Sequence, residues 1–152
     1  MLFRSIQMTI IAWDGITLAA DKRAVINGLS RTLTKIFRLK NGDLFGACGD
    51  MTYCLQMLEW VQNGMKPEDF PKEQRDKDDW QVCVVIIEGV LHLFERTPYA
   101  IVFEDTFYAC GSGRDYAIAA MHLGKTAKEA VEVACIFDTG CGNGVDELRQ
   151  NQ

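Results

Sequence analysis

Short apolar runs separated by turn residues fill the first fifty positions, a pattern typical of β-strands. Residues 8–13 and 16–20 are mostly apolar and flank an Asp-Gly pair. Glycine tolerates the positive φ of a tight turn, so these two runs predict an antiparallel hairpin. The segments "TKIFRL" and "LFGAC" flank "KNGD" at 40–43 and predict a second hairpin, whereas "NGLSR" at 27–31 predicts a polar loop.

Residues 50–64 follow a helical period instead. Their apolar side chains recur at spacings of three and four. These positions are Met51, Cys54, Leu55, Leu58 and Val61. Asp50 is suited to cap the helix at its start, and Gly64 is suited to end it. Bulky residues occur on more than one face, so we expect this helix to bury a second surface against a neighbouring molecule. These bulky residues are Tyr53, Met57, Leu58 and Trp60.

A charged segment at 66–79 holds two of the three prolines and predicts an exposed connection. Beyond it, apolar segments predict a second group of strands, at 80–89, 90–96, 100–104 and 106–110. Residues 114–124 and 126–137 show helical spacing, and the second segment opens on the capping-box pair Thr126 and Glu129. The chain from residue 138 onward is glycine-rich and then polar.

The order of predicted elements is strands, one helix, strands and two helices. Two antiparallel sheets packed face to face, with helices on both outer sides, satisfy this order. The predicted fold class is therefore α+β, with the layers of an αββα sandwich. A length of 152 residues fits a single domain over residues 1–152 with a sizeable core.

Composition narrows the functional classes. The formal net charge is −5, and the 16 lysines and arginines form no basic stripe, which argues against a nucleic-acid partner. The longest apolar stretch, at 82–94, is interrupted by Glu88 and Gly89, so we expect no membrane-spanning helix. Six cysteines lie dispersed without CxxC spacing beside only two histidines, which predicts reduced thiols, a cytoplasmic location and no metal site.

Five motifs follow one another along residues 8 to 146: "TIIAWDGITLAAD", "TKIFRL", "GACGD", "YACGSG" and "DTGCGNGVD". This order resembles that of proteasome β-type subunits. It is also similar to the order in the bacterial proteasome-like peptidase of the HslUV system and in its short phage and bacterial homologues. The resemblance implies the fold of an N-terminal-nucleophile hydrolase and a threonine-type peptidase or amidase activity.

In such an enzyme, a threonine exposed as the first residue is the nucleophile, and its own α-amine, with a pKa of about 8, takes the hydroxyl proton. A lysine ammonium keeps that amine neutral, a carboxylate holds the lysine, and a backbone N–H receives the oxyanion. The resemblance assigns these last three roles to Lys35, Asp21 and Gly49. It assigns a supporting network to Ser112, Asp138 and Cys141, where cysteine, a weaker hydrogen-bonding group, replaces a serine.

Two interpretations of the nucleophile position are open. Counting back along the first strand, Met8 falls at the family's nucleophile position and Thr9 at the next one. Side chains alternate faces along a strand, so a bulge or the shorter hairpin must compensate if Thr9 is the nucleophile. In the first reading, residues 1–7 are a leader or a mis-assigned start, and Thr9 becomes N-terminal. In the second, Thr9 stays internal without a free amine, and the chain is inactive.

The two readings imply different functions. An active chain cleaves peptide or protein substrates without a cofactor, whereas an inactive chain is a self-assembling scaffold or binding module. A third reading, a cysteine-dependent hydrolase using Cys48 or Cys141, lacks a sequence context that pairs either thiol with His92 or His122. The resemblance further implies a homo-oligomeric ring and an ATP-dependent unfoldase as partner.

Overall fold

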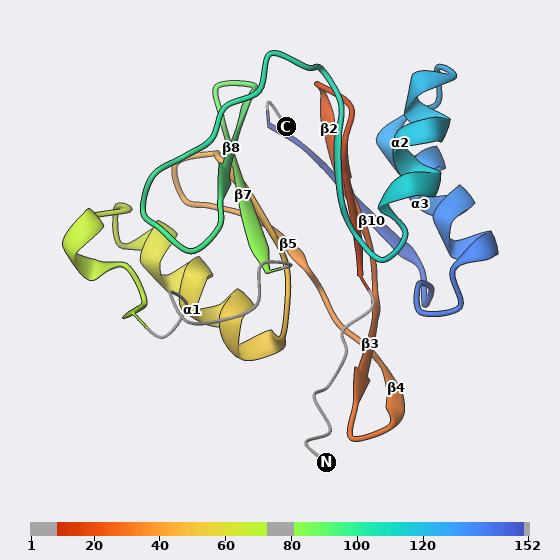
Figure 1. Ribbon diagram of the computed structural model, residues 1–152, viewed down its shortest axis with the longest axis horizontal. Helices are drawn as coiled ribbons and strands as arrows, with labels where there is room; N and C mark the ends of the chain where they lie inside the picture. The colour runs from red at the N-terminus through yellow and green to blue at the C-terminus, as the bar shows by residue number, and fades with distance from the viewer. Residues whose placement is uncertain (1–8, 73–80, 151–152) are drawn as a thin grey trace.

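Two stacked β-sheets form the centre of the protein in a computed structural model, which describes residues 9–72 and 81–150 (Figure 1). The first sheet has the order β10-β2-β1-β9, with bounds Val145–Arg149, Thr17–Asp21, Ile10–Trp13 and Tyr108–Gly111. The second has the order β5-β6-β7-β8, with bounds Ile36–Arg38, Leu44–Cys48, Val82–Ile87 and Val90–Phe94. Neighbouring strands in both sheets are antiparallel.

Helices cover the outer faces of both sheets (Figure 1). The first sheet carries α2 (Arg114–His122) and α3 (Ala127–Phe137), and the second carries α1 (Met51–Gln62), which is followed by the short 3₁₀ helix η1 (Pro67–Asp69). This arrangement confirms the predicted α+β class and the αββα sandwich. In the described part of the chain, no helix has the length and apolar character needed to cross a bilayer.

The predicted hairpins are confirmed. The Asp14 carboxylate accepts hydrogen bonds from the N–H groups of Ile16, at 2.9 Å, and Thr17, at 2.7 Å, and so closes the turn between β1 and β2. The segment at 40–43 joins β5 to β6 in an antiparallel pair. Both turns are local in sequence, which explains why the pattern revealed them.

The predicted helix caps are also confirmed. The Asp50 carboxylate accepts a hydrogen bond from the Tyr53 N–H at 2.7 Å, and Thr126 and Glu129 form a complete capping box on α3. Whether α1 contacts a neighbouring molecule stays a prediction, but three of the four bulky side chains named for that contact pack instead against the second sheet. These buried residues are Tyr53, Met57 and Trp60.

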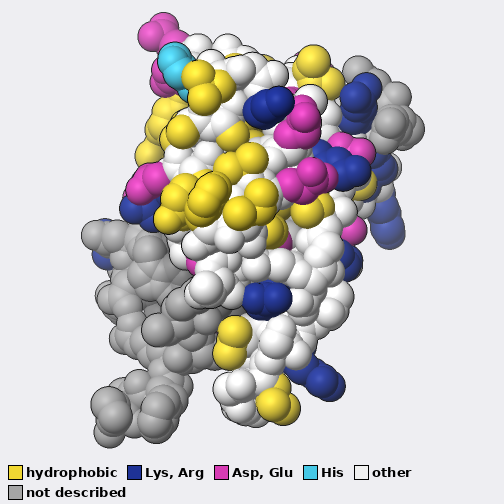
Figure 2. Space-filling view, turned by 90° about the vertical axis from the view of Figure 1, so that its right-hand side faces the viewer, with side chains coloured by type: hydrophobic (Ala, Val, Ile, Leu, Met, Phe, Trp, Pro, Cys, Tyr) yellow, Lys and Arg dark blue, Asp and Glu magenta, His cyan; other side chains and the backbone are white. Residues whose placement is uncertain are grey.

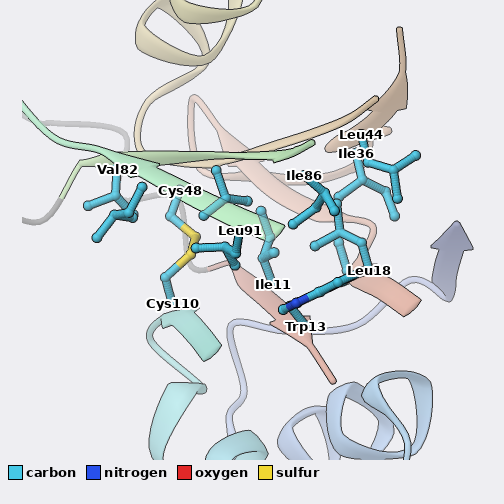
Figure 3. Close-up of a cluster of buried hydrophobic side chains, with 13 residues drawn as sticks. Ile11, Trp13, Leu18, Ile36, Leu44, Cys48, Val82, Ile86, Leu91 and Cys110 are labelled. Atoms are coloured by element: carbon cyan, nitrogen blue, oxygen red, sulfur yellow. A yellow bond between two sulfur atoms is a disulfide. The ribbon is translucent and has the colours of Figure 1, made fainter. Parts of the chain in front are cut away.

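Buried side chains form clusters above, between and below the sheets. In β1, Ile10 and Ala12 pack under α2 and α3, whereas Ile11 and Trp13 lie between the two sheets (Figure 3). A further cluster lies between α1 and the second sheet. Because both faces of β1 are buried, its sequence is a continuous apolar run and not an alternating one.

The predicted polar loop at 27–31 instead belongs to a two-stranded hairpin. Here β3 (Arg23–Ile26) pairs with β4 (Leu29–Thr32). Asn27, with φ 51°, and Gly28, with φ 79°, both take the positive φ that a two-residue hairpin turn requires. The strands were missed because their side chains are mostly exposed, so no apolar run marks them.

Other segments also differ from the prediction or lie partly outside the described residues. The polar tail forms strand β10, because backbone pairing with β2 does not need an apolar sequence. The predicted strand at 100–104 is wrong, since the segment is exposed and only Ile101 makes a bridge, to Leu93. Half of the predicted connection at 66–79 lies outside the described residues, and the described half, at 66–72, is mostly exposed apart from Phe70.

A disulfide joins the two sheets. Cys48 at the end of β6 is bonded to Cys110 in β9, with 6.5 Å between their Cα atoms. This corrects the prediction of reduced thiols for these two residues. The remaining cysteines are free, at Cys54, Cys83, Cys135 and Cys141. The pairing left no sign in the sequence, because the partners are 62 residues apart and meet only when the sheets stack.

Candidate active site

Asp21, the last residue of β2, is fully buried, and its carboxylate is surrounded by donors. Oδ1 accepts from Lys35 Nζ at 2.7 Å and from the Ile10 N–H at 3.2 Å. Oδ2 accepts from the N–H groups of Gly142, at 3.0 Å, and Arg23, at 3.3 Å. A buried carboxylate is costly unless it is paired and hydrogen-bonded, and both conditions hold here.

Lys35 reaches this carboxylate from the other sheet. It immediately precedes β5, and its side chain is 6% exposed while that of Asp21 is 0% exposed. The ion pair therefore connects the first sheet to the second in the interior of the protein. The structure brings together the two residues that the resemblance assigned as carboxylate and lysine.

Thr9 is buried immediately before β1, and its neighbour Ile10 contacts this ion pair. The peptide N–H of Ile10, directly after Thr9, is the group that binds Asp21 Oδ1. On the other side, a Cβ placed on Gly111 (φ +104°) would lie 1.7 Å from the Thr9 carbonyl oxygen, so the backbone packs here without room for a side chain. The predicted leader at 1–7 and Met8 lie outside the described residues.

Ser112, Asp138 and Cys141 also lie together. The Ser112 hydroxyl is 4.0 Å from the Cys141 sulfur, and the Asp138 carboxylate accepts from the Gly140 N–H at 2.9 Å. Burial alone would raise the pKa of Asp138, but hydrogen bonds from Ser112, Gly140 and Cys141 outweigh it and lower this pKa. Residue 142, next to this group, donates its N–H to Asp21, which links the two halves of the site.

The cysteine-dependent reading finds no support. Cys48 is held in the disulfide and has no thiol to ionise. Burial, followed by the negative charges of Asp21 and Asp138, raises the pKa of the Cys141 thiol to about 12. A thiol with this pKa is protonated at neutral pH, and the thiolate is the nucleophilic form.

Gly49 lies in the turn between β6 and α1. Gln81, a residue that the sequence analysis missed, holds this turn in place. The buried Gln81 accepts a hydrogen bond from the Asp50 N–H through Oε1, at 3.1 Å. A lone glutamine before a strand carries no sequence signal for this contact. A small, mostly apolar hollow lies beside the turn, lined by Lys35 and by residues on both sides of Gly49. The main lining residues are Lys35, Phe37, Ala47, Met51, Leu55 and Leu58.

Gly49→Ala is expected to lower stability by about 1–3 kcal/mol and to impair any chemistry that uses the Gly49 N–H. The added Cβ would lie 2.7 Å from the buried Tyr53 ring and 3.0 Å from Gln81 Oε1. Urea denaturation and peptide-hydrolysis rates measure the two effects. Gly42→Ala is the control for backbone strain, because its φ of +92° also disfavours alanine while its Cβ meets nothing within 4 Å, so that the difference between the variants reports the clash. Because alanine keeps the backbone N–H, unchanged hydrolysis together with lowered stability would show that the rate does not depend on the exact position of this N–H.

The described residues hold no group of three or more His, Cys, Asp or Glu arranged to bind a metal ion. The expectation that the chain works without a cofactor stays a prediction. Every contact of the candidate site described above joins side chains and backbone groups of the chain itself.

Comparisons with known proteins identify the fold. No protein-family model matches the sequence, and no curated protein matches it. Among solved structures, eukaryotic HslV from Trypanosoma brucei is similar, with a TM-score of 0.69 and 19% identity over 92% of this chain and 97% of that chain. BPH from Thiobacillus denitrificans has a TM-score of 0.66 and 18% identity, over 93% and 96%. The same protein in complex with epoxomicin has a TM-score of 0.66 and 15% identity, over 95% and 100%. The chain thus has the αββα sandwich fold of HslV, in agreement with the resemblance in its motifs.

Proposed function

We propose that the protein is a threonine-type peptidase that uses Thr9 as nucleophile after the residues before it are removed. One observation carries the proposal: a single oxygen of Asp21 binds both the Lys35 ammonium and the peptide N–H that follows Thr9. The proposed catalytic cation and the peptide group that follows the candidate nucleophile are therefore anchored to the same atom. The fold shared with HslV is consistent with this assignment.

The proposed chemistry needs a free Thr9 amine. With a pKa of about 8, this amine takes the hydroxyl proton as the oxygen attacks an amide carbonyl. The nearby Lys35 ammonium disfavours protonation of the amine, and Asp21 holds Lys35 in place. The Gly49 N–H would receive the developing oxyanion. Ser112, Asp138 and Cys141 form the supporting network of this proposal.

The strand register favours Thr9 over Met8 as the nucleophile. Along β1, Ile10 packs under the helices, whereas Ile11 lies between the sheets. Continuing this alternation by one residue turns Thr9 toward the second sheet, from which Lys35 reaches into the site. The shorter β1–β2 hairpin then compensates for the one-residue displacement of Thr9 that appears when positions are counted back along the first strand.

The apolar hollow beside Lys35 suggests the substrate class. Its lining side chains, among them Phe37, Met51 and Leu58, are suited to an apolar side chain of a peptide. The peptidase proposal therefore includes peptides or unfolded proteins with an apolar residue next to the cleaved bond. An ATP-dependent unfoldase as partner belongs to the same proposal.

A peptide epoxyketone tests the proposal, because its ketone and epoxide carbons can bond to the hydroxyl and the amine of one N-terminal threonine. A chain expressed from Met8 should lose that methionine, show the intact mass of a chain starting at Thr9, and gain one covalent adduct. Thr9→Ala should gain none and should hydrolyse no peptide. Hydrolysis by Thr9→Ala at the unaltered rate would rule out this nucleophile.

A self-assembling scaffold is the second candidate, and an exposed apolar patch on α2 and α3 favours it. Figure 2 shows hydrophobic side chains gathered on this face of the molecule. Ile136 is 73% exposed and Phe137 63% exposed, and the Phe137 ring stacks on Tyr116 at 5.5 Å. A patch of this kind fits a second copy of the chain in a homo-oligomer. An assembled protein that starts at Thr9 and forms no adduct in the experiment above would favour the scaffold over the peptidase.

A further inference from the structure

The Cys48–Cys110 disulfide is a covalent link between the two sheets at one end of the inter-sheet core. Figure 3 shows the bond among buried apolar side chains that include Ile11, Val82 and Leu91. Cys48 belongs to β6 of the second sheet, and Cys110 belongs to β9 of the first. Both residues are buried. Their bonded sulfur atoms are therefore shielded from solvent as long as the core stays closed.

Each half of the disulfide is next in sequence to a part of the candidate site. Cys48 directly precedes Gly49, the proposed oxyanion donor. Cys110 directly precedes Gly111, whose backbone packs against the Thr9 carbonyl, and it pairs with Ile11 of β1. The bond therefore ties the strand that ends at the oxyanion donor to the strand beside the nucleophile.

We propose that this disulfide positions the site, so that the oxidised protein is the active form and reduction lowers its turnover. The inference rests on the proposed peptidase function. Bonded sulfurs lie about 2 Å apart, whereas two unbonded heavy atoms rest at about 3.5–4 Å. Reduction thus lets β6 and β9 separate by more than 1 Å, and a displacement of about 1 Å at a reacting centre can cost 100-fold in rate.

The redox step is a two-electron thiol–disulfide exchange with a dithiol reductant. One thiolate of the reductant attacks a sulfur of the bridge and forms a mixed disulfide, which releases the other cysteine. The second thiol of the reductant then closes a cyclic disulfide and releases the remaining cysteine. The protein gains two thiol hydrogens, and the reductant is oxidised. A small-molecule disulfide reverses the exchange.

The test is a redox titration of the protein that starts at Thr9, in mixtures of reduced and oxidised dithiothreitol. Trapping with iodoacetamide and peptide mass analysis report the reduced fraction at Cys48 and Cys110. We expect kcat, assayed before trapping, to fall about 10- to 100-fold as the reduced fraction of both cysteines rises. KM should stay within about twofold, because an oxyanion donor acts mainly in the transition state. Reoxidation should restore kcat.

Two variants complete the test. Cys48→Ala with Cys110→Ala should have low kcat from the start and should not respond to the reductant. Cys135→Ser removes a free, partly buried cysteine in α3 and should respond as the unmodified protein does. Circular dichroism checks that each sample is folded, and if the double variant does not fold, the titration of the unmodified protein decides alone. An unchanged kcat in the fully reduced, folded protein would overturn the proposal.

Hydrogen exchange separates this proposal from the peptidase proposal itself. If neither redox form hydrolyses peptides, the proposed function has failed, and the positioning role is decided by amide exchange alone. Faster exchange on reduction, confined to residues 9–11, 49–50 and 110–112, would support a cross-link that holds this region in place. Equal exchange in both redox forms would refute it.

Discussion

Replacing Lys35 by methionine is expected to lower the rate of peptide hydrolysis at least 100- to 1000-fold, the order of effect of removing a preorganised charge or donor at the reacting centre. Methionine keeps most of the buried stem but removes the ammonium that Asp21 holds at 2.7 Å. Without that charge, the Thr9 amine binds its proton more tightly. The rising limb of the pH–rate profile should therefore move to higher pH.

The free energy of unfolding should fall less in Lys35→Met than in a variant that removes Asp21. In Lys35→Met, the Asp21 carboxylate still accepts hydrogen bonds from the N–H groups of Ile10, Arg23 and Gly142. kcat and KM are measured from pH 6 to 10, together with the urea midpoint. Lys22→Met is the matched control, because it removes a partly exposed lysine that pairs with Asp146 at 2.7 Å. Equal rates for the two variants would exclude a catalytic role for Lys35.

Asp21→Ala is expected to lower the free energy of unfolding by about 3–5 kcal/mol, the usual cost of breaking a buried ion pair from one side. The change leaves the Lys35 ammonium buried without its anion. It also leaves the N–H groups of Ile10 and Gly142 without their carboxylate acceptor. Urea denaturation, with the slope compared between variants, measures this loss.

A double-mutant cycle sharpens this prediction. Asp21→Ala combined with Lys35→Met should be more stable than Asp21→Ala alone, because the second change removes the unpaired ammonium. Asp146→Ala breaks the partly exposed ion pair with Lys22 and should cost no more than about 1 kcal/mol. A loss for Asp21→Ala as small as that for Asp146→Ala would show that the buried pair does not anchor the fold.

The candidate site was partly predictable from the sequence. The motifs singled out Asp21 and Lys35, which the structure places in contact, and Ser112, Asp138 and Cys141, which it places together. Cys141, which stands where the resemblance has a serine, is buried, and burial raises the pKa of its thiol to about 12. Gln81 was missed, because a glutamine carries no pattern and its contact with Asp50 joins distant parts of the chain.

The sequence by itself determined the local elements and the layer order. The Asp14 turn, the Asp50 cap and the capping box on α3 are hydrogen bonds between residues within a few positions of one another, so their chemistry can be read along the chain. Apolar spacing likewise reports which face of a helix is buried. These signals were enough to predict an αββα sandwich.

Only the tertiary structure decided which distant groups meet. Strand β10 exists because β2 offers its backbone edge, and the Cys48–Cys110 bond exists because stacking brings β6 and β9 together. The same stacking brings Lys35 from the second sheet to Asp21 in the first. Such contacts depend on how two sheets pack face to face, and that packing is a sum over many side chains that no short stretch of sequence contains.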